Sequence, residues 1–139
     1  MSDLETADGS KVLIDCDRAI VEARQRGRAM ALKVGFTSGG ATLLATAISE
    51  LARNILQYAG QGEIVLQPLE RGSSQGVEVF ARDQGPGITD LRQAMEDGYS
   101  TAGRLGLGLP GVRRLMDEFE IDSGPDSGTM VRIVKWKHR

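Results

Sequence analysis

Glycine is concentrated between positions 85 and 111, and this stretch limits the folds open to the chain more than any other feature. Glycine weakens both helices and strands, and the segment 85–105 also contains proline, aspartate, serine and threonine. We therefore expect a long loop there, with a short helix at most at 90–96. A loop of this length inside a compact domain is usually functional, so we interpret 85–105 as a lid over a binding site.

The apolar pattern before the lid predicts one strand and two helices. A short apolar run at 11–16 predicts the strand, and Asp17 is placed to cap the helix that follows. A second helix begins after the turn at 37–40 and ends near Gly60. Both helices repeat apolar residues at helical spacing: Ile20, Ala23, Gly27, Ala31 and Val34 in the first, and Leu44, Ala47, Ile48, Leu51 and Ile55 in the second.

Four further strands complete the expected fold. Segments 63–69 and 77–83 are rich in Val, Ile and Leu, and the glycines and serines between them favour a hairpin. After the lid, Pro110 suits the first turn of a short helix, and two strands at 119–123 and 129–136 follow. Strands outnumber helices and pair mostly through hairpins. This predicts an α+β fold, a two-layer sandwich with helices on one face of a mixed sheet.

The residue composition excludes several kinds of chemistry. His138 is the one histidine, so a serine or cysteine nucleophile has no histidine base and a histidine zinc site cannot form. Any bound metal should be a hard ion with oxygen ligands, and Mg²⁺ is the natural candidate. The formal net charge of −2 removes the electrostatic argument for binding nucleic acid.

Length, cysteine content and hydropathy indicate the number of domains and the cellular compartment that we expect. A chain of 139 residues suits one domain, so we expect a single domain over 1–139. Cys16 is the one cysteine, which excludes an intrachain disulfide and fits a reducing compartment. The N-terminus is acidic, unlike an export signal, and no apolar run is long enough to span a membrane. We therefore expect a cytoplasmic protein without membrane contact.

Glu50 and Asn54 are one helical turn apart at the border of the second helix's apolar stripe. A carboxylate and an amide in this arrangement can hold a metal ion or activate a hydroxyl, because both oxygens project into one volume. The alternative is an ordinary polar flank of the helix. Ser49, Arg53 and Gln57 lie farther from the stripe, and we expect them to face solvent.

Asp83 ends the core-facing row of residues in the expected strand at 77–83. A carboxylate in that position is costly unless it is paired. Gly85 and Gly87 follow and leave the backbone open to a flat ligand beside the carboxylate. The alternative is a turn capped by Asp83. Thr129 lies on the core-facing side of a later strand, so we expect its hydroxyl to face the same interior as Asp83.

Gly106, Gly108 and Gly111 form a G-x-G-x-x-G pattern at the start of the helix after the lid. The pattern lacks the preceding strand of a dinucleotide-binding unit and the lysine of a P-loop. What remains is a glycine-rich helix N-terminus, whose backbone N–H groups favour phosphate. The alternative is a flexible loop before a capped helix.

Taken together, these motifs resemble those of the Bergerat-fold ATP-binding family, which includes gyrase and the histidine kinases. The resemblance rests on the order and spacing of Glu50-x-x-x-Asn54, Asp83-x-Gly85-x-Gly87, Gly106-x-Gly108 and Gly128-Thr129. It covers nearly the whole chain, and the expected order of elements agrees with it. Four segments are similar to the small single-domain switch kinases of the stressosome: 48–54, 83–88, 95–101 and 108–112.

The resemblance implies that ATP and Mg²⁺ bind along this row of motifs. Asp83 would accept a hydrogen bond from the adenine amino group, and Gly87, with Gly85 before it, would let the base lie against the backbone. Thr129 would contact the adenine side, directly or through water. Asn54 would bind the Mg²⁺ that bridges the ATP phosphates.

The resemblance also implies the residues of phosphoryl transfer. Glu50 would position or deprotonate the acceptor hydroxyl, and Gly106 and Gly108 would donate N–H groups to the phosphates. Arg104 would reach the γ-phosphate or the acceptor. The lid departs from the family pattern here, because it has Arg104 and Leu105 where further glycine is usual.

The activity implied by the resemblance is that of a Mg-ATP-dependent protein serine/threonine kinase. Its substrates would be STAS-domain scaffold proteins of the stressosome. It would then bind and activate a PP2C-type phosphatase that releases an alternative sigma-factor pathway. Two alternatives stay open: an anti-sigma-type partner-switching module in which ATP is mainly structural, and a free-standing ATPase. Some relatives are dimers, so a homodimer is open as well.

Overall fold

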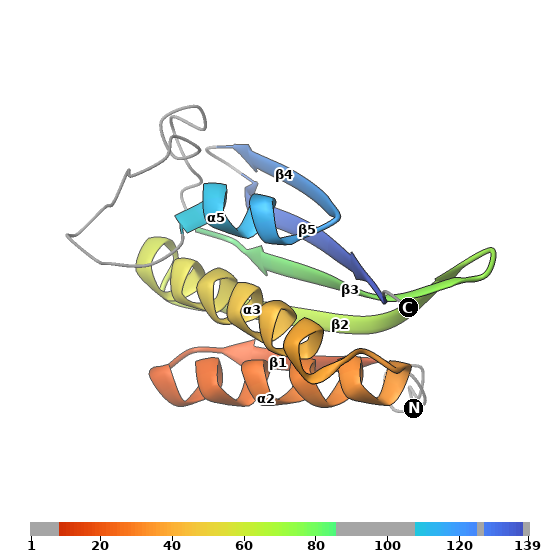
Figure 1. Ribbon diagram of the computed structural model, residues 1–139. Coiled ribbons are helices and arrows are strands. Elements are labelled where there is room, and N and C mark those ends of the chain that lie inside the picture. The colour runs from red at the N-terminus through yellow and green to blue at the C-terminus, as the bar shows by residue number, and fades with distance from the viewer. Residues whose placement is uncertain (1–8, 86–107, 125–126, 138–139) are drawn as a thin grey trace.

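The computed structural model describes residues 9–85, 108–124 and 127–137 (Figure 1). Most of the expected lid lies outside these ranges, as do three residues of the expected site, Gly87, Arg104 and Gly106. The described elements follow one another as β1 (Ser10–Ile14), α2 (Asp17–Val34), α3 (Ser38–Tyr58), β2 (Gly62–Arg71), β3 (Ser74–Asp83), α5 (Gly108–Leu115), β4 (Glu118–Gly124) and β5 (Gly128–Trp136).

The five strands form one sheet in the order β1-β2-β3-β5-β4, with α2, α3 and α5 on one face of it (Figure 1). The α+β two-layer fold is confirmed. One detail differs, because every strand pair described is antiparallel and the sheet is therefore not mixed. The reason is that α2 and α3 together return the chain to the end of β1, where Ile14 pairs with Gly62 at the start of β2.

The helices α2 and α3 bury the apolar faces that their sequences predict. All five of the predicted apolar residues of α3 are buried, and four of the five in α2, with Val34 partly buried. The predicted cap of α2 is wrong, because Cys16 occupies the capping position and makes no side-chain hydrogen bond there. Asp17 instead lies in the first turn, where its negative charge suits the helix dipole. None of the described helices is long and apolar enough to cross a membrane.

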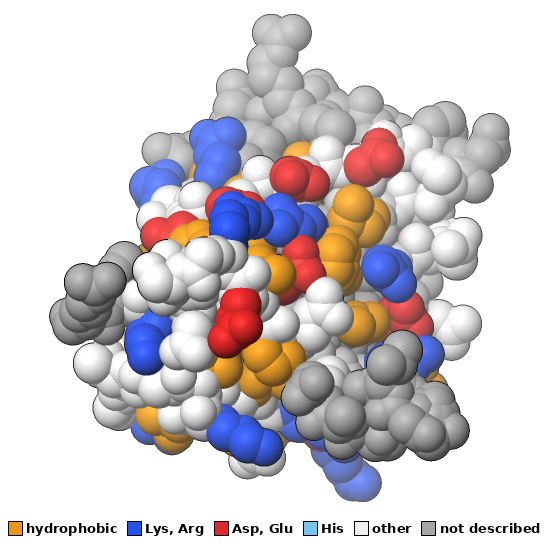
Figure 2. All heavy atoms as spheres, turned by 90° about the vertical axis from the view of Figure 1, so that its right-hand side faces the viewer, with side chains coloured by type: hydrophobic (Ala, Val, Ile, Leu, Met, Phe, Trp, Pro, Cys, Tyr) orange, Lys and Arg blue, Asp and Glu red, His pale blue; other side chains and the backbone are white. Residues whose placement is uncertain are grey.

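The sheet face away from the helices is held by a network of ion pairs. Arg132 donates to Glu78 at 2.6 Å and to Glu118 at 3.2 Å. Glu118 also accepts from Arg71 at 2.8 Å and from the Trp136 indole at 3.2 Å. On the side of the molecule in Figure 2, acidic and basic side chains are interspersed rather than gathered into patches of one sign.

Replacing Glu118 by Gln is expected to make the free energy of unfolding depend less on pH in the acidic range. Hydrogen bonding from Arg71, with help from Trp136 and Arg132, lowers the pKa of Glu118 below its usual 4.5 against the opposing effect of burial. The lowered pKa stabilises the fold above pH 4.5, and this contribution is lost as the pH falls through the folded-state value. We expect Glu118→Gln to cost below about 1 kcal/mol at neutral pH, because solvent screens the pair.

Urea unfolding of wild type and variant from neutral to acidic pH checks this expectation. The two stability curves should converge as the pH falls. Glu120→Gln is the matched control for the loss of one carboxylate, because this exposed side chain also pairs with Arg132, at 3.3 Å. A gap between wild type and Glu118→Gln that stays constant at all pH values would contradict the assignment.

Candidate functional site

A small pocket lies between α3, the neighbouring ends of β3 and β5, and the first turn of α5. We call it the α3–sheet pocket. It is narrow, about 20 Å³, so a larger ligand would require its side chains to move apart. Its lining is mostly apolar, with polar groups from three elements: Leu51, Asn54, Ile55 and Tyr58 on α3, Ala81 and Asp83 on β3, Leu109 on α5, and Thr129 and Val131 on β5.

Asp83 is the buried carboxylate of this pocket. It is the last residue of β3, pairs in register with Thr129 of β5 and is 8% exposed. Its Oδ1 accepts a hydrogen bond from the Gly85 N–H at 2.9 Å, so Asp83 does cap the turn after β3. Among the residues that the structure describes, Gly85 is the one hydrogen-bond partner of this carboxylate. The second oxygen, Oδ2, has no hydrogen-bond partner within the described ranges.

Gly128 brings β5 against the end of β3. Its φ of +73° lies in the left-handed region, which side chains rarely adopt. A Cβ at this position would also collide with the backbone carbonyl oxygen of Asp83. The close approach places Thr129 beside Asp83 in the pocket, as expected from the sequence. The Thr129 hydroxyl shares a 2.7 Å hydrogen bond with the Ser123 hydroxyl of β4.

Asn54 and Glu50 lie one turn apart on α3 but in different surroundings. Asn54 is partly exposed and lines the α3–sheet pocket. Glu50 is only 2% exposed and is not among the described residues that line this pocket. One of its oxygens lies 3.5 Å from Nη1 of Arg53, which is itself exposed. The structure therefore brings Asn54, Asp83 and Thr129 together, with Glu50 one helical turn away.

The side of α3 that carries Ser49 and Glu50 is more buried than the helical pattern predicts. The expectation that Ser49 faces solvent is wrong, because this residue is 4% exposed and its hydroxyl donates to the Ala45 carbonyl at 3.1 Å. The helices α2 and α5 both pack against α3, which covers further sides of a helix that already packs on the sheet. Such a contact between distant segments is not visible in the periodicity of α3 alone.

The N-terminus of α5 opens at the α3–sheet pocket. Gly108 is the first residue of α5 and has a φ of +65°, which glycine adopts without strain. Leu109, the next residue, lines the pocket, and Pro110 lies in the first turn as expected. The first backbone N–H groups of the helix have no partner within it and are thus suited to an anion.

Residues 15–135 match the family of histidine kinase-like ATPase domains. The chain belongs to this family. Among its relatives, the serine/threonine-protein kinase RsbT of Bacillus subtilis is 50% identical over 129 residues, which cover 93% of this chain and 97% of the kinase. An anti-sigma F factor of Thermoanaerobacter sp. is 33% identical over 97 residues, 66% of each chain.

The solved structure of the mycobacterial sensor histidine kinase MprB confirms the fold of this histidine kinase-like ATPase domain. It superposes with a TM-score of 0.53 over 89% of this chain and 95% of the MprB chain, at 20% sequence identity. The identity to RsbT over nearly the full length of both chains confirms the enzyme class expected from the sequence, a protein serine/threonine kinase. Membership of the family implies that ATP is the nucleotide used.

The polar groups of the pocket suit a metal ion that is coordinated mainly by the phosphates of a bound nucleotide. No cluster of three or more His, Cys, Asp or Glu side chains that could hold a metal occurs within the ranges that the structure describes. Mg²⁺ usually keeps several waters and takes only one or two protein oxygens in addition to phosphate oxygens. The side-chain oxygen of Asn54 fits that modest requirement.

Sequence reasoning missed the apolar walls and the aromatic residue of the pocket. Leu51 and Ile55 were expected only as core, and Leu109 and Val131 carried no signal of a site. Tyr58 could have been found, because it lies one helical turn after Asn54 on the same side of α3.

Proposed function

We propose that this chain is a Mg-ATP-dependent kinase of STAS-domain scaffold or antagonist proteins, acting as a single cytoplasmic domain. After phosphorylating serine or threonine on such a protein, it changes partner and activates a PP2C-type phosphatase in a stress pathway controlled by an alternative sigma factor. The observation that carries the proposal is the meeting of Asp83, Asn54 and Thr129 in one pocket at the N-terminus of α5. The relation to RsbT supports the kinase activity.

In this proposal the nucleotide base enters beside Asp83. Its Oδ2 accepts a hydrogen bond from the adenine amino group while Oδ1 keeps its bond to the Gly85 N–H. Thr129, next to Asp83 in the sheet, contacts the other edge of the base, directly or through water. The apolar residues of the pocket pack on the faces of the ring. Gly87, which lies outside the described residues, has no side chain that could obstruct the base.

The phosphates lie toward α5. The N–H groups of Gly108 and, from the undescribed part of the loop, Gly106 donate to phosphate oxygens, because a helix N-terminus favours negative charge. The side-chain oxygen of Asn54 would hold the Mg²⁺, and a bound Mg²⁺ would supply positive charge that neutralises the phosphates. Arg104, which also lies outside the described residues, interacts with the γ-phosphate or with the acceptor.

Glu50 acts on the acceptor hydroxyl. The hydroxyl oxygen attacks the γ-phosphorus as the bond to the bridging β–γ oxygen breaks, ADP leaves, and the hydroxyl proton passes to the Glu50 carboxylate. Arg53 lies beside this carboxylate, with 3.5 Å between its Nη1 and a Glu50 oxygen. Glu50 must turn one oxygen toward the acceptor for this step, which is compatible with its place one turn from Asn54.

Incubation with radiolabelled ATP and purified STAS-domain proteins tests the proposal. We expect Mg²⁺-dependent transfer of label to serine or threonine of at least one such protein, and subsequent activation of a PP2C-type phosphatase by the released chain. Chelation of Mg²⁺ should stop transfer. Absence of label on every STAS-domain protein, with ATP binding intact, would contradict the proposed substrate class.

One relative favours a second candidate function. The 33% identity to an anti-sigma F factor fits a partner-switching module in which ATP mainly orders the lid. Tight binding of a sigma factor without phosphate transfer would support this alternative over the kinase.

A further inference from the structure

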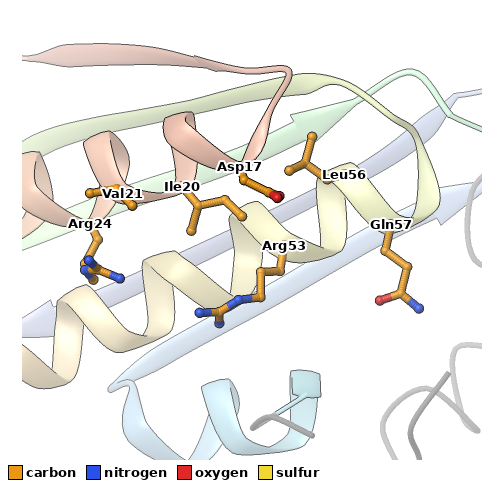
Figure 3. Close-up of a pocket in the computed structure, with 7 residues that line it drawn as sticks. All are labelled: Asp17, Ile20, Val21, Arg24, Arg53, Leu56 and Gln57. Carbon is orange, nitrogen blue, oxygen red and sulfur yellow. The ribbon is translucent and has the colours of Figure 1, made fainter. Parts of the chain in front are cut away.

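A second and larger cavity lies between α2 and α3 (Figure 3). It shares no lining residue with the α3–sheet pocket. We call it the α2–α3 groove. Its volume is about 530 Å³, large enough for several side chains of another protein. Seven residues line it: Asp17, Ile20, Val21 and Arg24 from α2, and Arg53, Leu56 and Gln57 from α3.

The groove combines an apolar floor with a rim that carries two arginines, Arg24 and Arg53, and one carboxylate, Asp17. Ile20, Val21 and Leu56 provide the apolar surface, and Val21 is 39% exposed although it is a large apolar side chain. In Figure 3 the side chains of Arg24 and Arg53 both point away from Leu56. Arg24 forms no ion pair with any residue that the structure describes.

The charge of α2 reinforces this rim. The helix has five basic and two acidic side chains, a net charge of +3, whereas the whole chain has a net charge of −2. An apolar surface beside an unpaired arginine on a positively charged helix is complementary to a segment that carries a carboxylate next to an apolar side chain.

Arg53 connects the groove to the proposed catalytic residue. Its guanidinium lines the groove, and its Nη1 lies 3.5 Å from the buried Glu50 carboxylate. Whatever occupies the groove is therefore separated from Glu50 by one side chain. A protein that presents a hydroxyl near Glu50 would cover this groove with the residues around the hydroxyl.

We propose that the α2–α3 groove binds the acceptor protein through an acidic side chain flanked by an apolar one. This proposal rests on the proposed kinase function and names the recognition element of its substrate. The carboxylate of the acceptor pairs with Arg24 and Arg53, and the apolar side chain covers Ile20 and Val21. Arg24 is the specificity-determining residue, since its charge has no other described partner.

The test is a charge reversal at Arg24, with Arg18→Glu as the matched control. Arg18 is an exposed residue of the same helix, lies outside the groove and changes the net charge equally. We expect Arg24→Glu to raise the KM for an unphosphorylated STAS-domain substrate by about tenfold or more with kcat changed little, because like charges then face each other. Arg18→Glu should stay within about twofold of wild type.

Binding is measured separately from transfer. Calorimetric titration of the same STAS-domain protein, with a non-hydrolysable ATP analogue present, should show a weaker Kd for Arg24→Glu by a similar factor. Arg24→Gln should give an intermediate loss, which guards against a folding defect in the reversed variant. Reversal of one acidic residue of the acceptor to lysine should restore binding to Arg24→Glu.

Each outcome decides a different question. Unchanged KM and Kd in Arg24→Glu, with labelling intact, would overturn the groove as the docking site and leave the kinase assignment standing. Failure of the wild-type chain to bind or label any STAS-domain protein would instead overturn the proposed substrate class. A wild-type dimer that dissociates in Arg24→Glu, seen by sedimentation, would assign the groove to a second copy of this chain and overturn the proposal.

Discussion

Replacing Asp83 by Asn is expected to lower the affinity for ATP by about 10- to 100-fold, the loss of a hydrogen bond to a charged acceptor. The substitution keeps the shape of the side chain, and the amide oxygen can still accept the 2.9 Å bond from the Gly85 N–H. The other end of the side chain changes from an acceptor to an NH₂ donor, which would face the amino group of adenine. Two donors then oppose each other in a buried site.

The same substitution should change the preference between nucleotides. An NH₂ group at position 83 matches the carbonyl oxygen of guanine, so the affinity for GTP relative to ATP should rise in Asp83→Asn. Calorimetric titration with both nucleotides measures this shift. Asp122→Asn, an exposed aspartate of β4, is the control and should bind ATP as wild type does. Unchanged ATP affinity in a folded Asp83→Asn chain would show that Asp83 serves only the turn at Gly85.

The sequence predicts the fold well because most of its elements depend on local patterns. The apolar spacing of α3 identifies the buried face, and the alternation in β3 places Asp83 at the end of a core-facing row, where the structure has it. Side chains return to the same face every 3.6 residues in a helix and every two residues in a strand. Each pattern can therefore be recognised within a single segment of the chain. The meeting of Asn54, Asp83 and Thr129 follows from elements that were all placed correctly.

The features that the sequence does not predict depend on contacts between distant segments. Burial of Ser49 and Glu50 accompanies the packing of α3 against both α2 and α5, which lie elsewhere in the chain. The α2–α3 groove depends on how two helices lie against each other, so the arginines at its rim look like ordinary surface residues in sequence. The antiparallel pairing of β1 with β2 similarly depends on the direction in which two helices return the chain.

Replacing Glu50 by Gln is expected to lower the rate of phosphoryl transfer by about 10²- to 10⁴-fold, the usual contribution of a general base. Gln has nearly the same shape as Glu, which matters because a smaller residue at this 2% exposed position would leave a cavity. The amide oxygen can still accept from Arg53, as the carboxylate does at 3.5 Å. The variant therefore removes the charge and the basicity of the side chain and keeps its packing.

The measurement is single-turnover transfer of label to a STAS-domain protein at saturating ATP, with the Kd for ATP measured in parallel. The Kd should change little, because Glu50 is not among the described residues lining the α3–sheet pocket. Glu22→Gln is the control, since Glu22 is also a helical glutamate paired with an arginine, Arg26 at 2.8 Å, but is exposed. If Glu50→Gln transfers phosphate at the wild-type rate, the carboxylate is only a structural partner of Arg53. In that case the proton of the acceptor must pass to a different group.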